Sequence, residues 1–262
     1  MEATIQTYYL DKPLQVGRVF DVFEPKEITK DVAMFFVHGG GWRAGSRADY
    51  HKLMEAFVEK GYIVAATDYR LNAKTAFEQL DDIRQAYDKF ITILKEKNRP
   101  LKVAFHGGSA GAHLSSLILC TEYDGNLPLE NEWVKPVMGI LQSCPADFVY
   151  HEWRFPSIWS SMQSIAGVPY EEDPKPYEKL SLINYINASN PPLFFVGAEL
   201  EHMFPNEYTL EIVKKHREMG IPSQWKVYEK AEHGFFFDFT RKMQRDAFED
   251  ICKFLEEKLE TL

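Results

Sequence analysis

The sequence predicts an α/β fold with a mostly parallel central sheet and helices on both of its faces. Two kinds of segment alternate along most of the 262 residues, namely short continuous apolar runs and longer stretches with helical periodicity. Continuous apolar runs are typical of strands buried on both faces, as in a parallel sheet. Strands that alternate with helices join through right-handed crossovers, so the alternation itself indicates the fold class.

The first two strand candidates differ from the later ones. Residues 4–10 and 17–23 alternate apolar and polar side chains loosely, which predicts an antiparallel pair at an edge of the sheet. Six apolar runs follow as candidates for the inner strands: residues 31–37, 62–67, 102–105, 137–141, 193–196 and 224–228. Sheets of this kind hold their chemistry at the carboxyl ends of the strands, so the residues that follow each run are the candidates for function.

Helical periodicity separates these runs. Apolar residues recur every three or four positions between Phe77 and Leu94, which predicts a helix with one buried face. Residues 50–60, 205–219 and 243–255 follow the same pattern. The segment 145–190 is long for a connection and rich in aromatic residues, so we expect a short cap-like insertion over the functional site. We interpret residues 1–262 as one domain that carries this insertion.

Composition and charge narrow the classes of function. The formal net charge is −9, whereas phosphate contacts need clustered lysine and arginine, so we expect no nucleic-acid partner. The apolar runs are shorter than a membrane span, and residues 1–10 lack the pattern of a signal peptide, so we expect no membrane partner. The three cysteines have no metal-type spacing and are expected to be reduced, which indicates a cytoplasmic protein without a bound metal.

A predicted strand and a short apolar, helix-like segment flank the pentapeptide Gly107-Gly108-Ser109-Ala110-Gly111. This is the context of the nucleophile elbow, a sharp strand-to-helix turn that exposes a serine in a strained conformation. Large side chains beside the serine would collide with the strand and the helix, and the glycines and Ala110 avoid that collision. The amino end of the helix also favours negative charge that develops at Ser109.

A serine hydroxyl is a weak nucleophile unless a neighbouring base removes its proton. His233 follows the last predicted strand and is the only histidine in that loop, which makes it the candidate base. The base in turn needs a carboxylate that fixes its tautomer and stabilises the imidazolium. Glu201, after the preceding strand, is the first candidate, Glu199 is the second and Asp147 is the third.

An attacked carbonyl group becomes an oxyanion, which needs preorganised N–H donors. Ala110 follows the candidate nucleophile directly, so its backbone N–H is one expected donor. The run HGGGW at residues 38–42 follows the first inner strand, and glycine allows its backbone to approach a substrate closely. We expect Gly40 and Gly41 to supply the other donors because they sit deepest in this loop.

Other residues near these loops have a pocket-forming or a supporting role. Four aromatic residues are candidates for an acyl or leaving-group pocket, and ordinary packing beneath a cap is the equal alternative: Trp42, Trp153, Phe155 and Trp159. We expect His38 to hold the glycine loop in shape. Asp68 and Arg70 follow a strand and are expected to form a buried polar network that braces the same loop.

Together these motifs resemble a known family. The runs HGGGW at 38–42, DYRL at 68–71, GGSAG at 107–111 and EHGF at 232–235 occur in the order seen in α/β-hydrolases of the esterase/lipase branch. The sequence is similar to the hormone-sensitive-lipase-like and feruloyl-esterase-like groups, including acetylxylan-esterase-like and kynurenine-formamidase-like proteins, over roughly residues 15–260. The resemblance implies the α/β-hydrolase fold, a triad of Ser109, His233 and an acid, and no cofactor. Glu201 stands where this family usually has aspartate.

These features predict a serine carboxylic-ester hydrolase that acts through an acyl-enzyme on a small-molecule ester. We expect short-chain acyl esters, with acetylated or phenolic sugar esters among the candidates, because the segment 145–190 is short for a lipid-binding cap. An arylformamidase that acts on formyl amides is the alternative enzyme. A catalytically inactive homologue that binds a small ligand is the alternative of another class. A homodimer is compatible with the sequence, although no residue indicates one.

Overall fold

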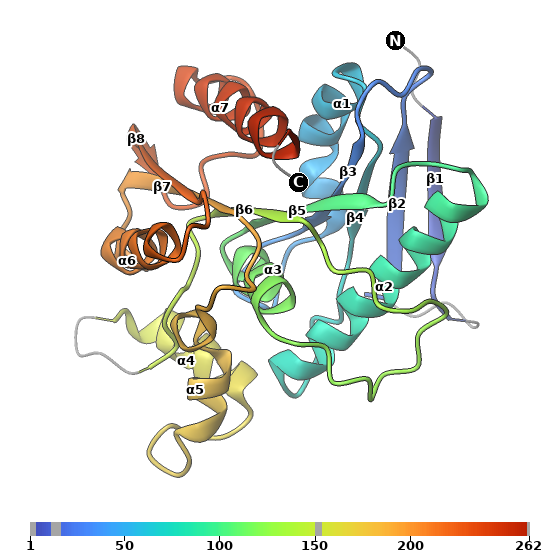
Figure 1. Cartoon of the computed structure of the whole chain (residues 1–262). Helices are drawn as coiled ribbons and strands as arrows, with labels where there is room; N and C mark the ends of the chain where they lie inside the picture. The colour runs from blue at the N-terminus through green and yellow to red at the C-terminus, as the bar shows by residue number, and fades with distance from the viewer. Residues whose placement is uncertain (1–3, 12–16, 150–153, 261–262) are drawn as a thin grey trace.

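The computed structural model describes residues 4–11, 17–149 and 154–260. In this part of the chain one sheet of eight strands has the order β1-β2-β4-β3-β5-β6-β7-β8 (Figure 1). The strands are β1 (Thr4–Tyr9), β2 (Val19–Glu24), β3 (Val32–Val37), β4 (Val64–Thr67), β5 (Lys102–Gly108), β6 (Met138–Gln142), β7 (Leu193–Leu200) and β8 (Gln224–Glu232). The pairs β1–β2 and β2–β4 are antiparallel and the other pairs are parallel, which confirms the predicted fold class.

Helices cover both faces of the sheet (Figure 1). Two of them pack on one face, namely α1 (His51–Glu59) and α7 (Lys242–Leu259). Three pack on the other, namely α2 (Ala76–Glu96), α3 (Ala110–Cys120) and α6 (Asn206–Glu218). Successive side chains of a strand point to opposite faces, so the adjacent residues Phe35 and Phe36 of β3 belong to two different cores. Burial on both faces explains why the inner strands are continuous apolar runs.

The segment predicted as a cap-like insertion connects β6 to β7. It contains α4 (Pro156–Ala166), α5 (Lys175–Leu180) and the short 3-10 helix η2 (Leu182–Tyr185). Trp159 packs against Tyr170 and Tyr177 with ring centroids 5.6 and 5.4 Å apart, and these rings continue the core on the α3 side of the sheet. A second 3-10 helix, η1 (Arg47–Tyr50), leads into α1.

The described residues contain no membrane-spanning helix, no metal-binding cluster and no disulfide bond. None of their helices combines the length and the apolar composition that crossing a bilayer requires. The same residues bring together no group of three histidine, cysteine or acidic side chains that would hold a metal ion. Cys120, Cys144 and Cys252 are free thiols.

Candidate active site

The turn between β5 and α3 holds Ser109 in a strained backbone conformation. Its φ is 53° and its ψ is −119°, a region that residues with a side chain rarely adopt. The neighbouring glycines permit the turn, because a Cβ on Gly107 would lie 2.4 Å from Gly111 O and one on Gly111 would lie 2.0 Å from Val37 O. The Ser109 N–H donates to Gln142 O (2.9 Å), which ties the turn to β6. The serine therefore stands at the carboxyl end of β5, in the geometry of a nucleophile elbow.

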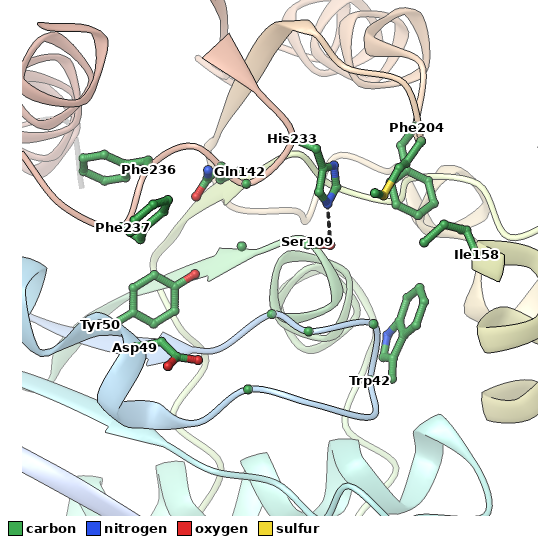
Figure 2. Close-up of a pocket in the computed structure, with 17 residues that line it drawn as sticks. Trp42, Asp49, Tyr50, Ser109, Gln142, Ile158, Phe204, His233, Phe236 and Phe237 are labelled. Carbon is green, nitrogen blue, oxygen red and sulfur yellow. Dashed lines mark hydrogen bonds between the residues drawn. The ribbon is translucent and has the colours of Figure 1, made fainter. Parts of the chain in front are cut away.

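His233 lies beside Ser109 although 124 residues separate the two in the sequence. Its Nε2 atom is 2.8 Å from Ser109 Oγ (Figure 2). His233 follows the end of β8, and the left-handed conformation of Gly234 (φ 69°) turns the chain directly after it. The imidazole is therefore placed where Nε2 can accept the hydroxyl proton.

Glu201 is the carboxylate that the structure brings to His233. The chain turns at the end of β7, where the Glu201 N–H donates to Ala198 O (3.2 Å), and both carboxylate oxygens lie within 2.9 Å of His233 Nδ1. The N–H groups of Met203 and Phe204 donate to Oε1 at 2.9 and 3.3 Å. Burial raises the pKa of Glu201, but the hydrogen bonds from His233 and the two amides outweigh it and hold the pKa below its ordinary value. The ionised carboxylate keeps the ring proton on Nδ1.

The two other candidate acids lie elsewhere. Glu199 is exposed on β7 and accepts a hydrogen bond from the Lys230 N–H (2.8 Å). Asp147 accepts hydrogen bonds from the Val149 N–H (3.0 Å) and the Ser181 hydroxyl (3.4 Å). The first-ranked candidate is thus the one that the structure pairs with the histidine.

The three backbone amides expected to bind an oxyanion lie around Ser109. Gly40 and Gly41 line the cavity above it, and Ala110 is the first residue of α3. No residue in the described part of the chain accepts a hydrogen bond from the N–H of Gly40, Gly41 or Ala110. These donors are therefore left for a ligand.

The carbonyl groups of the glycine loop explain how its amides are oriented. His38 Nδ1 lies 2.8 Å from Gly39 O, and the Ala44 N–H donates to Gly40 O at 2.9 Å. In a trans peptide the carbonyl and the N–H point in opposite directions. Fixing Gly39 O and Gly40 O on one side therefore directs the N–H groups of Gly40 and Gly41 to the other side.

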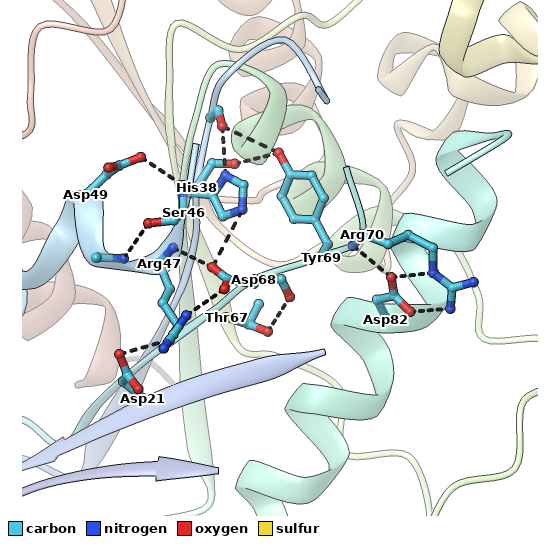
Figure 3. A network of polar contacts seen from close by, with 12 residues as sticks. Asp21, His38, Ser46, Arg47, Asp49, Thr67, Asp68, Tyr69, Arg70 and Asp82 are labelled. Carbon is cyan, nitrogen blue, oxygen red and sulfur yellow. Dashed lines mark hydrogen bonds and ion pairs between the residues drawn. The ribbon is translucent and has the colours of Figure 1, made fainter. Parts of the chain in front are cut away.

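A polar network supports His38 in turn (Figure 3). The Tyr69 hydroxyl donates to His38 O (3.0 Å), and the two rings stack with centroids 4.2 Å apart. Asp68 accepts two hydrogen bonds from Arg47, both at 2.6 Å, and its Oδ1 lies 4.0 Å from His38 Nε2. Burial lowers the pKa of His38 more than the nearby Asp68 raises it, so the ring is neutral and Nδ1–H donates to the loop.

Arg70 does not pair with Asp68. It belongs to a second network, which reaches the glycine loop at Trp42. Its guanidinium binds Asp82 of α2 at 2.6 and 2.7 Å. Gln79, one turn earlier on the same helix, donates to Trp42 O (2.8 Å) and Arg70 O (3.0 Å). The expected single network is therefore two networks, because Asp68 pairs with Arg47 whereas Arg70 pairs with Asp82.

Gln142 and Ser143, at the end of β6, connect the serine turn to the histidine loop. The Gln142 carboxamide accepts hydrogen bonds from the N–H groups of residues 235–236 at 2.8 and 2.7 Å and donates to the carbonyl of residue 236 at 3.2 Å. Ser143 Oγ accepts from the Gly234 N–H (3.2 Å). Because Gln142 O also binds the Ser109 N–H, this short segment sets the spacing between Ser109 and the loop of the histidine.

A cavity of about 620 Å³ opens over Ser109 (Figure 2). Its lining has two chemically different sides. One side, which we call the apolar arm, is formed by Trp42, Ile158 and Phe204. The other side, which we call the acidic arm, is formed by Asp49, Tyr50, Phe236 and Phe237. Only Trp42 among these was expected from the sequence, because the others lie on four separate segments that share no motif.

The four aromatic residues considered for the pocket separate into three groups. Trp42 lines the cavity, and its indole N–H donates to His113 Nδ1 (3.2 Å). Trp153 lies outside the described residues. Phe155 and Trp159 are not among the lining residues, because the Phe155 ring lies edge-on to His202 and Trp159 packs against Tyr177. On α4 it is the neighbouring Ile158 that faces the cavity, which corrects the pocket expectation for these two residues.

The chain matches the BD-FAE family over residues 20–215, which is more than half of its length. The chain belongs to this family. It is an α/β-hydrolase of the esterase/lipase branch, as its motifs implied. A further match, to the Dienelactone hydrolase family, covers residues 176–259 of this α/β-hydrolase.

Named relatives align with parts of this α/β-hydrolase. It is 24% identical over 197 residues to the probable carboxylic ester hydrolase LipM of Mycobacterium tuberculosis, covering 71% of the chain and 45% of LipM. It is 24% identical over 234 residues to esterase LipQ of the same organism, covering 84% of the chain and 53% of LipQ. Kynurenine formamidase of Drosophila melanogaster is 33% identical over 103 residues, 39% of the chain and 34% of that protein. The chain thus spans about half the length of the two mycobacterial relatives and about a third of the formamidase.

Solved structures share the fold over nearly the whole chain. Esterase B from Lactobacillus Rhamnosis superposes with a TM-score of 0.81 at 15% identity, covering 97% of this chain and 85% of that one. The butyrate-bound esterase Est2 from Thermogutta terrifontis gives a TM-score of 0.76 at 21% identity, covering 96% and 93%. At these identities the likeness establishes the α/β-hydrolase fold.

Proposed function

We propose that this α/β-hydrolase is a serine carboxylesterase that cleaves short-chain acyl esters through an acyl-enzyme. One observation carries the proposal. Ser109 Oγ, His233 and Glu201 form a continuous hydrogen-bonded relay, with contacts of 2.8 and 2.7 Å, at the wall of a cavity that opens over the serine. The ester-hydrolase names of LipM and LipQ support the same reaction class.

The first half-reaction acylates the serine. His233 Nε2 takes the hydroxyl proton while Ser109 Oγ attacks the ester carbonyl carbon. The carbonyl oxygen becomes an oxyanion, which the N–H groups of Gly40, Gly41 and Ala110 stabilise. The bond from carbon to the leaving oxygen then breaks, the imidazolium returns its proton to that oxygen, and the alcohol departs.

The second half-reaction uses water in place of the serine. His233 takes a proton from the water as its oxygen attacks the acyl carbon, and the same three amides hold the second oxyanion. The bond to Ser109 Oγ breaks and Oγ recovers the proton. The products are one carboxylic acid and one alcohol for each ester and water consumed, and the ionised Glu201 offsets the imidazolium charge in both halves.

The apolar arm is the proposed site for the short acyl group. Trp42 is 1% exposed and Phe204 is 6% exposed, so both are held firmly by their surroundings. Together with Ile158 they offer an apolar wall next to Ser109, where a small hydrocarbon gains from leaving water. Acetylated and phenolic sugar esters stay candidate substrates within this class.

Arylformamidase activity is the second candidate function, favoured by similarity to kynurenine formamidases of Drosophila melanogaster and Danio rerio. The relay would act on a formyl amide in the same way, with His233 protonating a departing nitrogen in place of an oxygen. An inactive ligand-binding homologue is disfavoured, because the base stands 2.8 Å from Ser109 Oγ.

A substrate panel tests the proposal. We expect the chain to hydrolyse p-nitrophenyl acetate and butyrate faster than octanoate, with a methyl ferulate and an N-formyl aniline included to separate the alternatives. Ser109→Ala should abolish turnover and labelling by a fluorophosphonate probe. Ser115→Ala is the matched control, since Ser115 is buried on α3, which begins directly after Ser109, and its hydroxyl has no hydrogen-bond partner among the described residues. Turnover that survives in Ser109→Ala, or a wild-type chain that the probe does not label, would contradict the proposal.

A further inference from the structure

Asp49 is the only acidic side chain among the described residues that line the cavity. A capping box on η1 sets its position, with Asp49 Oδ2 accepting the Ser46 N–H at 2.9 Å and Ser46 Oγ accepting the Ala48 N–H at 3.2 Å. This local role uses one carboxylate oxygen. The other oxygen, Oδ1, accepts no hydrogen bond from any residue that the structure describes, so it is left for a ligand.

The charge of Asp49 is not neutralised at the cavity wall. No lysine or arginine in the described part of the chain lines the cavity. Two cations close to Asp49 in the sequence point elsewhere. Arg47 pairs with Asp21 and Asp68 at 2.9 and 2.6 Å, and Lys52 lies in another surface cleft. The acidic arm therefore presents a negative potential to whatever lies over it.

Aromatic rings complete the acidic arm. Tyr50 follows Asp49 directly, and Phe236 and Phe237 approach from the loop that carries the histidine (Figure 2). Phe237 is 48% exposed, which leaves its ring available at the mouth of the cavity. The face of an aromatic ring attracts cations, and ammonium ligands are held by such rings together with a carboxylate. The same wall repels a carboxylate ligand.

We propose that the acidic arm selects substrates that carry a positively charged ammonium group, with Asp49 as the residue that determines this specificity. The inference rests on the proposed function, since the same cavity must hold the scissile ester over Ser109. The ammonium group forms and breaks no bond. Its attraction to Asp49 stabilises the bound ester, so the effect appears in kcat/KM.

Two isosteric esters test the inference. Acetylcholine and 3,3-dimethylbutyl acetate carry the same acyl group and have nearly the same shape. They differ at one atom, which is a positively charged nitrogen in acetylcholine and a neutral carbon in the other ester. We expect the wild-type chain to show a kcat/KM about threefold to tenfold higher for the cation, as for a charge pair near a solvated surface. Asp49→Asn keeps an oxygen for the Ser46 N–H and should bring this ratio to about one. Glu55→Gln is the control, because it removes a negative charge outside the cavity, in the surface cleft that also contains Lys52. The ratio should be unchanged in this variant.

The outcomes separate the inference from the proposed function. A wild-type ratio of about one or below, or an unchanged ratio in Asp49→Asn, overturns the inference. If neither ester is hydrolysed above the Ser109→Ala background, the proposed function fails. The inference about Asp49 is then tested by measuring ligand binding. Calorimetry on Ser109→Ala should then show tighter binding of choline than of 3,3-dimethylbutan-1-ol, and adding Asp49→Asn should remove the difference. Equal binding of the two alcohols overturns it.

Discussion

Glu201 meets His233 with both carboxylate oxygens, which lie 2.9 and 2.7 Å from Nδ1. The Glu201 side chain is 2% exposed and does not line the cavity, whereas the histidine that it contacts does. A buried carboxylate stays ionised only when hydrogen bonds replace the water it has lost. Met203 and Phe204 supply two of these bonds through their backbone N–H groups, so the acid is held in place before a substrate arrives.

Replacing Glu201 should lower turnover without a matching loss of binding. In Glu201→Gln the amide can present a donor to Nδ1, which favours the wrong tautomer of His233 and removes the charge that stabilises the imidazolium. We expect kcat to fall by about 10²- to 10⁴-fold with KM little changed, measured on p-nitrophenyl acetate. Glu199→Gln removes a neighbouring exposed carboxylate and should retain kcat. Equal losses in the two variants would show that Glu201 is not the acid of the relay.

Tyr69 should contribute to turnover through the glycine loop. Tyr69→Phe removes only the hydroxyl that donates to His38 O, so the loop amides lose part of their preorganisation. One such hydrogen bond is worth about 0.5–1.5 kcal/mol, which predicts a roughly twofold to tenfold lower kcat. Tyr87→Phe is the control, because the buried Tyr87 hydroxyl has no partner among the described residues. A kcat in Tyr69→Phe equal to that of the control would contradict the role of the network.

Gln142 should affect both stability and turnover. Gln142→Leu keeps similar bulk but leaves the N–H groups of residues 235–236 buried without acceptors. We expect the free energy of unfolding in urea to fall by about 2–4 kcal/mol. At a temperature where the variant is folded, kcat and the rate of fluorophosphonate labelling should fall together, because the spacing between Ser109 and His233 is relaxed. A stability loss with unchanged kcat would restrict Gln142 to a structural role.

Stability should decline in mild acid because four buried histidines, His38, His106, His113 and His216, are neutral in the folded chain. Burial lowers the pKa of His106 to about 3, and the pKa values of His113 and His216 to about 4, from an ordinary value of 6.5. Below that ordinary value the unfolded chain binds protons that the folded chain refuses, so stability is full above about pH 6.5 and is lost as pH falls. Each histidine contributes about 1.4 kcal/mol per pH unit in this window.

Urea unfolding between about pH 7.5 and pH 5 measures this slope. His106→Phe should reduce it by about one quarter. The change should be tolerated, because both ring nitrogens of His106 lack partners among the described residues and the ring stacks on Phe36 with centroids 4.5 Å apart. An unaltered slope in this variant would show that His106 does not contribute to the acid sensitivity.

The order of strands and helices was predictable because burial constrains the pattern of apolar residues within each strand and each helix. A strand covered on both faces must be apolar at each position, as in β3, and a helix with one buried face must repeat its apolar residues every three or four positions, as in α2. Ser109 and the loop of Gly40 and Gly41 were equally visible, because a tight turn or a close backbone approach excludes most side chains.

What the sequence alone could not decide are the contacts between segments that meet only in the folded chain. Glu199 and Glu201 are two residues apart and chemically alike, and the turn at the end of β7 determines which one reaches His233. The side of α4 that faces the cavity, with Ile158 in place of Trp159, depends in the same way on how the insertion packs. Local sequence determined which groups could react, and tertiary packing decided which of them lie within reach of one another, because distance in space is set by long-range contacts that leave no local pattern.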